Sequence, residues 1–240
     1  MKVRFVLVFA LLILAFSCKK TQPATTFKEV EITIAPTSIV SVVIPKAEGN
    51  PEVSKNINQA ITETIGKALM VADSDPANWP LETLIDNFDT AYQNFKAEFP
   101  ESALIWEAQI DGEVLFQSPE VISIALTIYT NTGGAHGITS VRLLNFDAAT
   151  GQLVPNEKLI SKQQAFEALV KAKLEKEVAE RNIDVFDPKS FTMPQNIGFN
   201  NRGLILLYNQ YEIAPYASGI IDFEIPYEEA EDLLTFDSMQ

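Results

Sequence analysis

The sequence predicts an α+β fold: a mainly antiparallel sheet packed against helices, in two αβ lobes that form one compact unit. Segments with period-two alternation of apolar residues occur in runs joined by turn residues, most clearly over 121–154. Segments with helical periodicity stand between these runs and do not alternate with single strands. Strand runs joined by hairpins, with helices inserted between them, indicate α+β architecture.

The first residues are typical of an export signal. Lys2 and Arg4 precede an apolar run that is shorter than the roughly 20 apolar residues needed to span a bilayer. The junction that ends at Cys18 resembles a bacterial lipoprotein cleavage site, although Phe16 is bulkier than the residue usual there. We expect a lipoprotein signal peptide over 1–17 and lipidation of Cys18. A plain secretory signal and an uncleaved anchor are the alternatives.

The charge of the chain limits its partners. The full chain carries a net charge of −14, and loss of Lys2 and Arg4 with the signal lowers it to −16. This acidity argues against nucleic acid and anionic lipid as partners, and it fits either plain solubility or a basic partner. Residues 18–28 form the expected lipid anchor and tether, and Lys19 and Lys20 are not the acidic residues that resemble a surface-export tag. We therefore expect a Gram-negative outer-membrane lipoprotein facing the periplasm, with surface exposure left open.

Single cysteine and histidine residues exclude much chemistry. Cys18 is the only cysteine, which excludes an intrachain disulfide, a thiol nucleophile and a thiolate metal site. His136 is the only histidine, which excludes a multi-histidine metal site and leaves one residue for any Ser-His-Asp triad. We expect no metal, no cofactor and no catalytic residue. Among the 32 carboxylates a glycosidase pair remains open.

The N-terminal αβ lobe is expected over 29–118. Asn50 and Pro51 supply a capping residue and a proline at the first helical position. Pro80 opens a second helix, and the Asp111-Gly112 pair predicts a two-residue hairpin turn. The expected elements are helices over 51–71 and 80–99, and strands over 30–34, 39–44, 104–110 and 113–117.

The C-terminal αβ lobe, with the glycine-histidine loop, is expected over 119–240. Ile122 to Ile128 place alternate apolar residues on one core face, whereas 138–146 is apolar on both faces and is therefore expected to be a central strand. Ser161 with Gln164 predicts a capping box. The expected elements are strands over 121–129, 138–146, 152–154, 191–199, 204–208 and 221–225, and helices over 161–181 and 226–234.

A glycine-rich bend over 131–137 holds the centre of a candidate binding site. The candidate ligand-binding residues are Asn131, Gly133, Gly134, His136, Tyr211 and Tyr216. We expect positive φ at Gly134, because such a bend needs it. His136 is interpreted as a residue that shapes the loop or packs in the core, with a general base as the alternative. Tyr129, Tyr211 and Tyr216 are expected to flank the loop, either as an aromatic ledge on the sheet or as a sugar-stacking platform.

Three segments together resemble a known bacterial family. They are Thr132-Gly133-Gly134-Ala135-His136-Gly137 with 145–151, the helix that follows, and Tyr211-Glu212-Ile213-Ala214-Pro215-Tyr216 with 225–227. The combination is similar to the RsiV/PdaC type of paired domains of unknown function, which occurs in a lysozyme-sensing anti-sigma factor and near the N-terminus of a peptidoglycan deacetylase. This sequence shows no sigma-binding segment and no deacetylase domain, so those activities are not carried over. The resemblance implies an envelope module that binds lysozyme or cell-wall glycan.

We therefore expect a non-catalytic cell-envelope lipoprotein that binds an extracytoplasmic ligand, lysozyme or cell-wall glycan. A carboxylate-dependent glycan hydrolase and a structural envelope lipoprotein are the alternatives. A hydrolase should gather inward-facing acids near His136 in a deep cleft. A binding protein should instead present an exposed loop platform.

Overall fold

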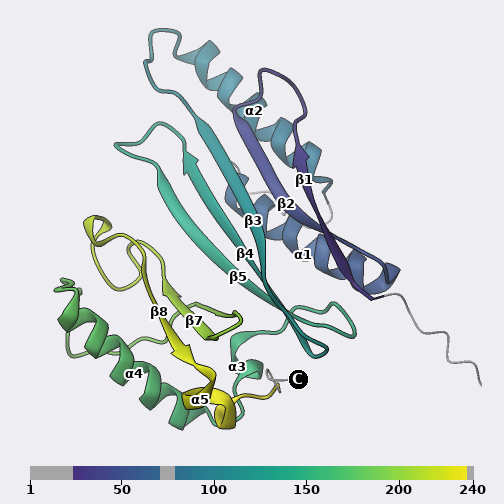
Figure 1. Ribbon diagram of the computed structural model, residues 1–240. Coiled ribbons are helices and arrows are strands. Elements are labelled where there is room, and N and C mark those ends of the chain that lie inside the picture. Colours follow the sequence, from purple (N-terminus) through teal and green to yellow (C-terminus); the bar gives the residue numbers. More distant parts are fainter. Residues whose placement is uncertain (1–23, 71–78, 237–240) are drawn as a thin grey trace, which may run out of the picture.

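The computed structural model describes residues 24–70 and 79–236, which build two sheets and their covering helices (Figure 1). Neighbouring strands are antiparallel in both sheets except for β2 and β3, which are parallel. The five-stranded sheet has the order β1 (Thr26–Ile32), β2 (Val40–Glu48), β3 (Glu107–Gln117), β4 (Val121–Asn131) and β5 (Ile138–Asp147). The three-stranded sheet has the order β6 (Asn196–Phe199), β7 (Gly203–Tyr208) and β8 (Ile221–Pro226).

The helices fall into two groups. The long ones are α1 (Pro51–Leu69), α2 (Leu81–Glu98) and α4 (Gln163–Glu180). The short ones are α3 (Asn156–Leu159), α5 (Tyr227–Ala230) and the 3₁₀ turns η1 (Tyr216–Ser218) and η2 (Glu231–Leu233). The expected signal peptide, Cys18 and the end of the first expected helix at Val71 lie outside the described residues. Within the described residues, no helix is long and apolar enough to cross a membrane.

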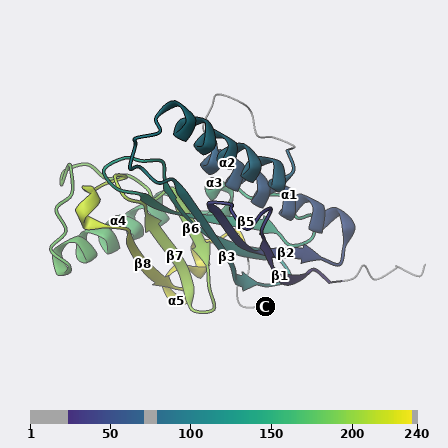
Figure 2. The ribbon, with the colours of Figure 1, turned by 90° about the horizontal axis from the view of Figure 1, so that it is seen from above.

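The elements stack as four layers. Helices α1 and α2 cover one face of the five-stranded sheet (Figure 2), and the three-stranded sheet packs on the other side. Strand β7 shows the alternation directly, because Leu204 and Leu206 face the core shared with α4, whereas Leu207 joins Ala125 and Leu143 between the two sheets. The predicted α+β fold, with a mainly antiparallel sheet and two lobes in one compact unit, is therefore confirmed.

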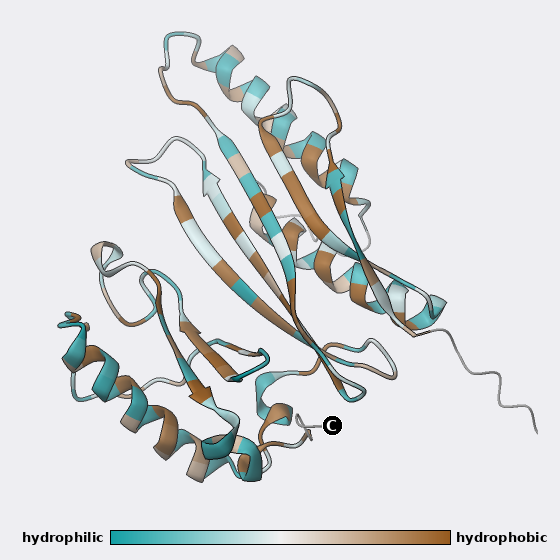
Figure 3. Ribbon diagram, viewed as in Figure 1, coloured by the Kyte–Doolittle hydropathy of each residue, from teal (hydrophilic) through white to brown (hydrophobic). Residues whose placement is uncertain are grey.

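Helix α1 forms as its sequence predicts. Asn50 Oδ1 accepts a hydrogen bond from the Glu52 backbone N–H at 3.1 Å, and Pro51 occupies the first turn. The buried residues recur at helical spacing and form the apolar stripe that meets the sheet (Figure 3); they are Val53, Ser54, Ile57, Ile61, Ile65, Gly66 and Leu69. This stripe and the core face of β4 build the larger hydrophobic core.

The predicted hairpin turn at Asp111-Gly112 is wrong. Strand β3 runs straight through these residues, and Gly112 pairs with Leu126 of β4. A Cβ atom on Gly112 would lie 2.8 Å from Pro45 Cδ and 2.9 Å from Leu126 Cδ2. The glycine therefore lets the side chains of Pro45 and Leu126 approach the strand closely. Close approach, and not a turn, explains the glycine at this position.

Strand β5 is buried on both faces over residues 143–146 as predicted, but residues 138–142 are exposed or half-buried, and the strand is not central in its ladder. It is the last strand of the five-stranded sheet, and β6 of the other sheet packs against it. Side chains of the C-terminal lobe satisfy its outer backbone groups: Asn209 exchanges bonds of 2.7 Å and 2.9 Å with Val141, and Asn196 Oδ1 accepts from the Leu143 N–H at 3.2 Å. The side-chain amides of Asn196 and Asn209 thus bond to the edge of β5, where a further strand would otherwise pair.

Two further expectations differ from the structure. Because β4 and β5 belong to the five-stranded sheet, the division between lobes falls after Asp147 and not between residues 118 and 119. The capping box at Ser161 is also wrong, since α4 begins at Gln163 without a side-chain cap and the Ser161 hydroxyl donates to the Leu233 carbonyl at 3.0 Å. The Ser161 hydroxyl therefore bonds to the C-terminal segment and does not cap α4.

Candidate functional site

Three aromatic rings meet where the β4–β5 loop faces the β7–β8 loop (Figure 1). We call His136, Tyr211 and Tyr216 the aromatic platform. The His136 and Tyr216 rings stack with centroids 3.8 Å apart and an interplanar angle of 24°. The Tyr211 ring follows with its centroid 5.8 Å from that of Tyr216. His136 and Tyr211 are exposed and Tyr216 is half-buried, so the platform presents ring surface to solvent.

The glycine-rich loop holds His136 through its own backbone. Asn131 Oδ1 accepts from the Gly133 N–H at 3.0 Å, and Gly133 has a φ of +88°. The Gly137 carbonyl oxygen accepts the Tyr216 hydroxyl at 3.1 Å and lies 3.0 Å from His136 Nδ1. One carbonyl thus fixes both stacked rings, so the loop and the C-terminal lobe are joined at this point.

The expectation of a positive φ at Gly134 is wrong. The left-handed conformation belongs to Gly133, and a Cβ atom on Gly134 would meet only the His136 carbonyl oxygen at an ordinary 3.6 Å. Gly137 is the second restricted position, because a side chain there would run into the Tyr129 ring. The bend does need its glycines, but the sequence pattern does not distinguish which of adjacent glycines adopts the unusual conformation.

Tyr129 packs beside the end of the glycine-rich loop and is not one of the exposed rings of the platform. Its hydroxyl donates to Glu107 Oε1 across the β3–β4 pair at 3.1 Å, and this hydrogen bond raises the pKa of Tyr129 above its usual value. The ring fills the space beside Gly137, which fixes the end of the loop. The expectation that Tyr129, Tyr211 and Tyr216 flank one loop is therefore met, with Tyr129 in a structural role.

Tyr211 adopts a backbone conformation that is unusual for a bulky residue. Its φ is +68°, in the left-handed region that favours glycine. It is the third residue of a turn closed by a hydrogen bond from the Glu212 N–H to the Asn209 carbonyl at 3.1 Å. The Glu212 carboxylate holds this turn by accepting the N–H groups of Gln195 and Asn209, each at 2.9 Å. A strained turn thus presents a ring that is 50% exposed.

Sequence reasoning missed the apolar neighbours of the platform. Leu104 and Ile105 are 41% and 67% exposed, and a Cβ atom on Gly133 would lie 3.0 Å from Leu104 Cδ1. The expected strand over 104–110 begins only at Glu107, so Leu104, which the alternation assigns to the core face, lies before β3 and is exposed. The available signal was Ile105 itself, an apolar residue at a position that the alternation assigns to solvent.

The platform is suited to contact more than to proton transfer. The His136 Nδ1 faces a backbone carbonyl, and no carboxylate within hydrogen-bonding distance orients the ring in the described part of the chain. Among the described residues no group of three or more histidine, cysteine, aspartate or glutamate side chains could hold a metal ion. The faces of the rings and the Tyr211 hydroxyl remain available for stacking and hydrogen bonding.

Comparison with known proteins divides the chain into two matched segments. The family model described as Deacetylase PdaC matches residues 35–139, and the model described as a protein of unknown function, DUF3298, matches residues 153–228. The chain pairs a PdaC-type segment with a DUF3298 segment. His136 lies in the PdaC-type segment, whereas Tyr211 and Tyr216 lie in the DUF3298 segment. The aromatic platform is therefore built jointly by both.

Solved structures show the same fold. A crystal structure of a DUF3298 family member from Bacteroides fragilis has a TM-score of 0.63 and 16% identity, over 90% of this chain and 96% of that one. A DUF3298 family protein from Pseudomonas aeruginosa has a TM-score of 0.58 and 16% identity, over 90% of this chain and 95% of that one. No curated protein matches the chain. These likenesses concern the fold alone, so function rests on the site.

Proposed function

We propose that this protein is a non-catalytic, lipid-anchored envelope protein that binds an extracytoplasmic ligand, lysozyme or cell-wall glycan, through the aromatic platform. The observation that carries the proposal is Tyr211, a half-exposed ring held at a φ of +68°. A strained backbone that persists at an exposed aromatic residue is typical of positions kept for contact. Glycine or asparagine would relieve the strain but would remove the ring.

The surroundings of Tyr211 support a binding surface of useful size. The His136 and Tyr216 rings extend it by stacking, and the exposed side chain of Leu104 adjoins the glycine-rich loop. Aromatic residues surrounded by apolar contacts commonly dominate the binding energy of interfaces. The negative charge of the chain, −14 before signal removal, would speed association with a basic protein such as lysozyme.

The rival reading as a carboxylate-dependent glycan hydrolase finds less support in this geometry. His136 is exposed on the platform, and the Glu107 carboxylate accepts the Tyr129 hydroxyl. A general acid or base needs a group held within reach of the scissile bond in a site that shields it from water. Deacetylation belongs to the protein for which the matching PdaC model is named, and we do not propose it here.

Lysozyme binding is expected to depend on the rings as well as on charge. In a titration of the full-length protein with lysozyme at about 0.05 M and about 0.3 M salt, affinity should fall with salt but persist. Replacing both His136 and Tyr216 with alanine should weaken binding at the higher salt by about tenfold or more, because two contact residues are lost. Leu153→Ala is the control, since this side chain is 50% exposed and its residue pairs with Phe146, at the end of β5 opposite to the platform.

Parallel titration with soluble peptidoglycan fragments separates the two ligand classes. Retention of fragments and not of lysozyme, with the same dependence on His136 and Tyr216, assigns the platform to glycan. Binding of lysozyme that vanishes at the higher salt, or that ignores the double substitution, would show that charge is the whole effect. Absence of binding to both probes would refute the proposed function.

Lipid anchoring is a separate part of the proposal and rests on the residues that precede the tether. Cys18→Ala should move the protein from the membrane fraction to the soluble fraction, because the acylated residue is lost. Membrane fractionation followed by immunoblotting measures the change. A variant that stays membrane-bound with an uncleaved N-terminus would identify residues 1–17 as an uncleaved anchor instead.

A further inference from the structure

A cavity of about 570 Å³ lies in the C-terminal lobe between α4 and the loop that leads to β6. Its volume falls within the roughly 300–1,000 Å³ typical of small-molecule sites. Residues from α4, from this loop and from the β7–β8 connection form its apolar wall: Leu174, Val178, Val185, Phe186, Phe191 and Ile213. Helix α4 is on the outer side of the lobe (Figure 1), and none of the three platform residues lines the cavity, whereas Glu212 and Ile213 beside Tyr211 do.

The loop over the cavity is fixed at both ends, so the space is preformed. The Phe186 N–H donates to the Ile213 carbonyl at 2.9 Å. The Tyr208 hydroxyl donates to the Thr192 carbonyl at 2.7 Å, and burial raises the pKa of this tyrosine well above its usual value, which keeps it protonated as a donor. Between these anchors, Asp187 Oδ1 accepts the Lys189 N–H at 3.0 Å and closes a local turn.

The charged residues around the cavity differ in how far their bonding capacity is used. Lys171, Glu175, Asp187, Lys189 and Glu212 line it. Both Glu212 oxygens accept backbone N–H groups, and Asp187 accepts the Lys189 N–H. The Lys171 ammonium is 4.0 Å from Glu175 with both side chains more than half exposed, and no carboxylate in the described residues pairs with Lys189. Unused hydrogen-bond donors are therefore concentrated in the two lysine ammonium groups, whereas unused acceptors belong to Glu175.

We propose that this cavity binds an amphipathic carboxylate, a free fatty acid with its hydrocarbon chain against the apolar wall and its carboxylate at Lys171 and Lys189. The apolar wall excludes water from a chain of methylene groups, which supplies the affinity. The two ammonium groups attract the carboxylate of the ligand. This inference goes beyond the proposed function and does not depend on the aromatic platform.

Calorimetric titration of the full-length protein with dodecanoate tests the inference. We expect one binding site for dodecanoate, weaker binding of the uncharged analogue dodecanol, and no binding of acetate, which lacks the chain. Changing Lys171 and Lys189 together to glutamine should weaken dodecanoate binding by about tenfold. Lys176→Gln is the matched control, because Lys176 is on the same helix, is 64% exposed and does not line the cavity.

A second variant tests the wall. Val178→Glu places a carboxylate among the apolar residues and should abolish dodecanoate binding while circular dichroism shows a folded chain. If this variant fails to fold, the titration of the variant with both Lys171 and Lys189 changed to glutamine decides the question. Dodecanol binding as tight as that of dodecanoate, equal loss in Lys176→Gln and in the double variant, or no dodecanoate binding would each overturn the inference. Lysozyme binding by the same variants should be unchanged, which distinguishes failure here from failure of the platform.

Discussion

Gly151→Ala is expected to lower the free energy of unfolding by about 3 kcal/mol, from the sum of backbone strain and overpacking. Gly151 ends the turn after β5 with a φ of +70°. A Cβ atom there would lie 2.8 Å from Val53 Cα and would also collide with the Val53 carbonyl, both in the backbone of α1. Because Asn56 of the same helix bonds to the Thr150 carbonyl at 2.8 Å, the turn cannot move away without losing this contact.

Two other glycines separate the contributions to this loss. Gly219 also has a φ of +70° but open space around it, so Gly219→Ala should cost only the strain, roughly 1–3 kcal/mol. Gly134→Ala has neither strain nor a close neighbour and should change stability by less than about 0.5 kcal/mol. Chemical denaturation of the three variants gives the order directly. Equal losses at Gly151 and Gly134 would contradict the geometry.

Asn145→Leu is expected to destabilise the protein by about 2–4 kcal/mol, because it breaks the buried polar link between the sheets. Asn145 is 1% exposed, and its Nδ2 donates to the Ile197 carbonyl of β6 at 2.6 Å. Its Oδ1 accepts the Ser123 hydroxyl at 2.9 Å, and the Ser123 oxygen accepts the Phe199 N–H at 3.1 Å. Leucine would leave the Ile197 carbonyl buried without this partner.

The double variant Ser123→Ala with Asn145→Leu measures how strongly the two side chains act together. Since both serve one network, the combined loss in urea unfolding should be less than the sum of the single losses. Ser41→Ala, at an exposed position of β2, is the control and should be close to neutral. Additive losses would show that Ser123 and Asn145 act independently, and a neutral Asn145→Leu would show that packing alone joins the sheets.

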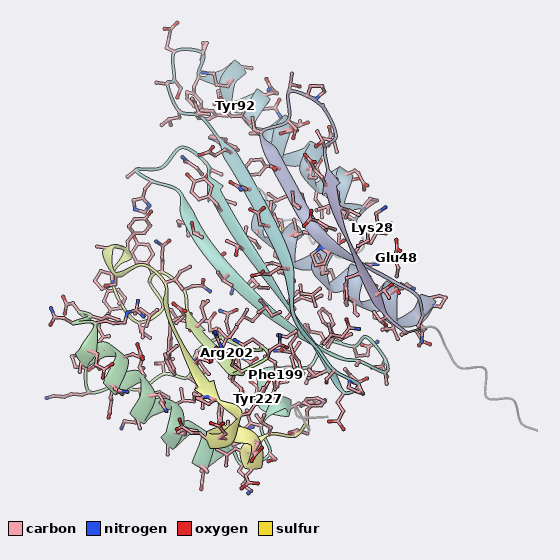
Figure 4. The ribbon with its side chains drawn as sticks, in the orientation of Figure 1. Lys28, Glu48, Tyr92, Phe199, Arg202 and Tyr227 are labelled. Atoms are coloured by element: carbon pink, nitrogen blue, oxygen red, sulfur yellow. The ribbon has the colours of Figure 1, made fainter. Side chains whose placement is uncertain are left out.

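The same region includes an aromatic contact between lobes. Phe199 and Tyr227 lie near each other and near Arg202 in the C-terminal lobe (Figure 4). Phe116, from β3 of the other sheet, has its ring centroid 6.2 Å from that of Phe199 and 6.4 Å from that of Tyr227. The polar network and this aromatic cluster together hold the two lobes in one unit. The aromatic platform depends on this union, because His136 comes from one lobe and Tyr211 and Tyr216 come from the other.

Local patterns predicted the elements whose signals are local. The cap at Asn50 and the period of α1 depend on residues close in sequence, and both form as expected. The burial of β5 on both faces over residues 143–146 was also predictable from its apolar residues. Its place at the edge was not, because the Asn196 and Asn209 side chains that cover it come from a segment more than 50 residues later.

Glycine roles and the platform illustrate the limit of such patterns. Gly112 suits a turn by composition, and only the packing of Pro45 and Leu126 shows why a strand needs it. The sequence indicated His136, Tyr211 and Tyr216 as candidates, whereas their stacking depends on tertiary contacts between two lobes. Their role in binding a ligand remains a prediction of the sequence and a proposal from the geometry.

Tyr211→Gly tests the central claim most directly, because it separates stability from binding. Glycine tolerates the φ of +68°, so the free energy of unfolding should stay within about 1 kcal/mol of the parent value. Lysozyme titration at about 0.3 M salt should nevertheless show affinity lower by about tenfold or more, because the exposed ring is gone. Affinity equal to that of the parent protein, in a variant of equal stability, would contradict the platform as the binding site.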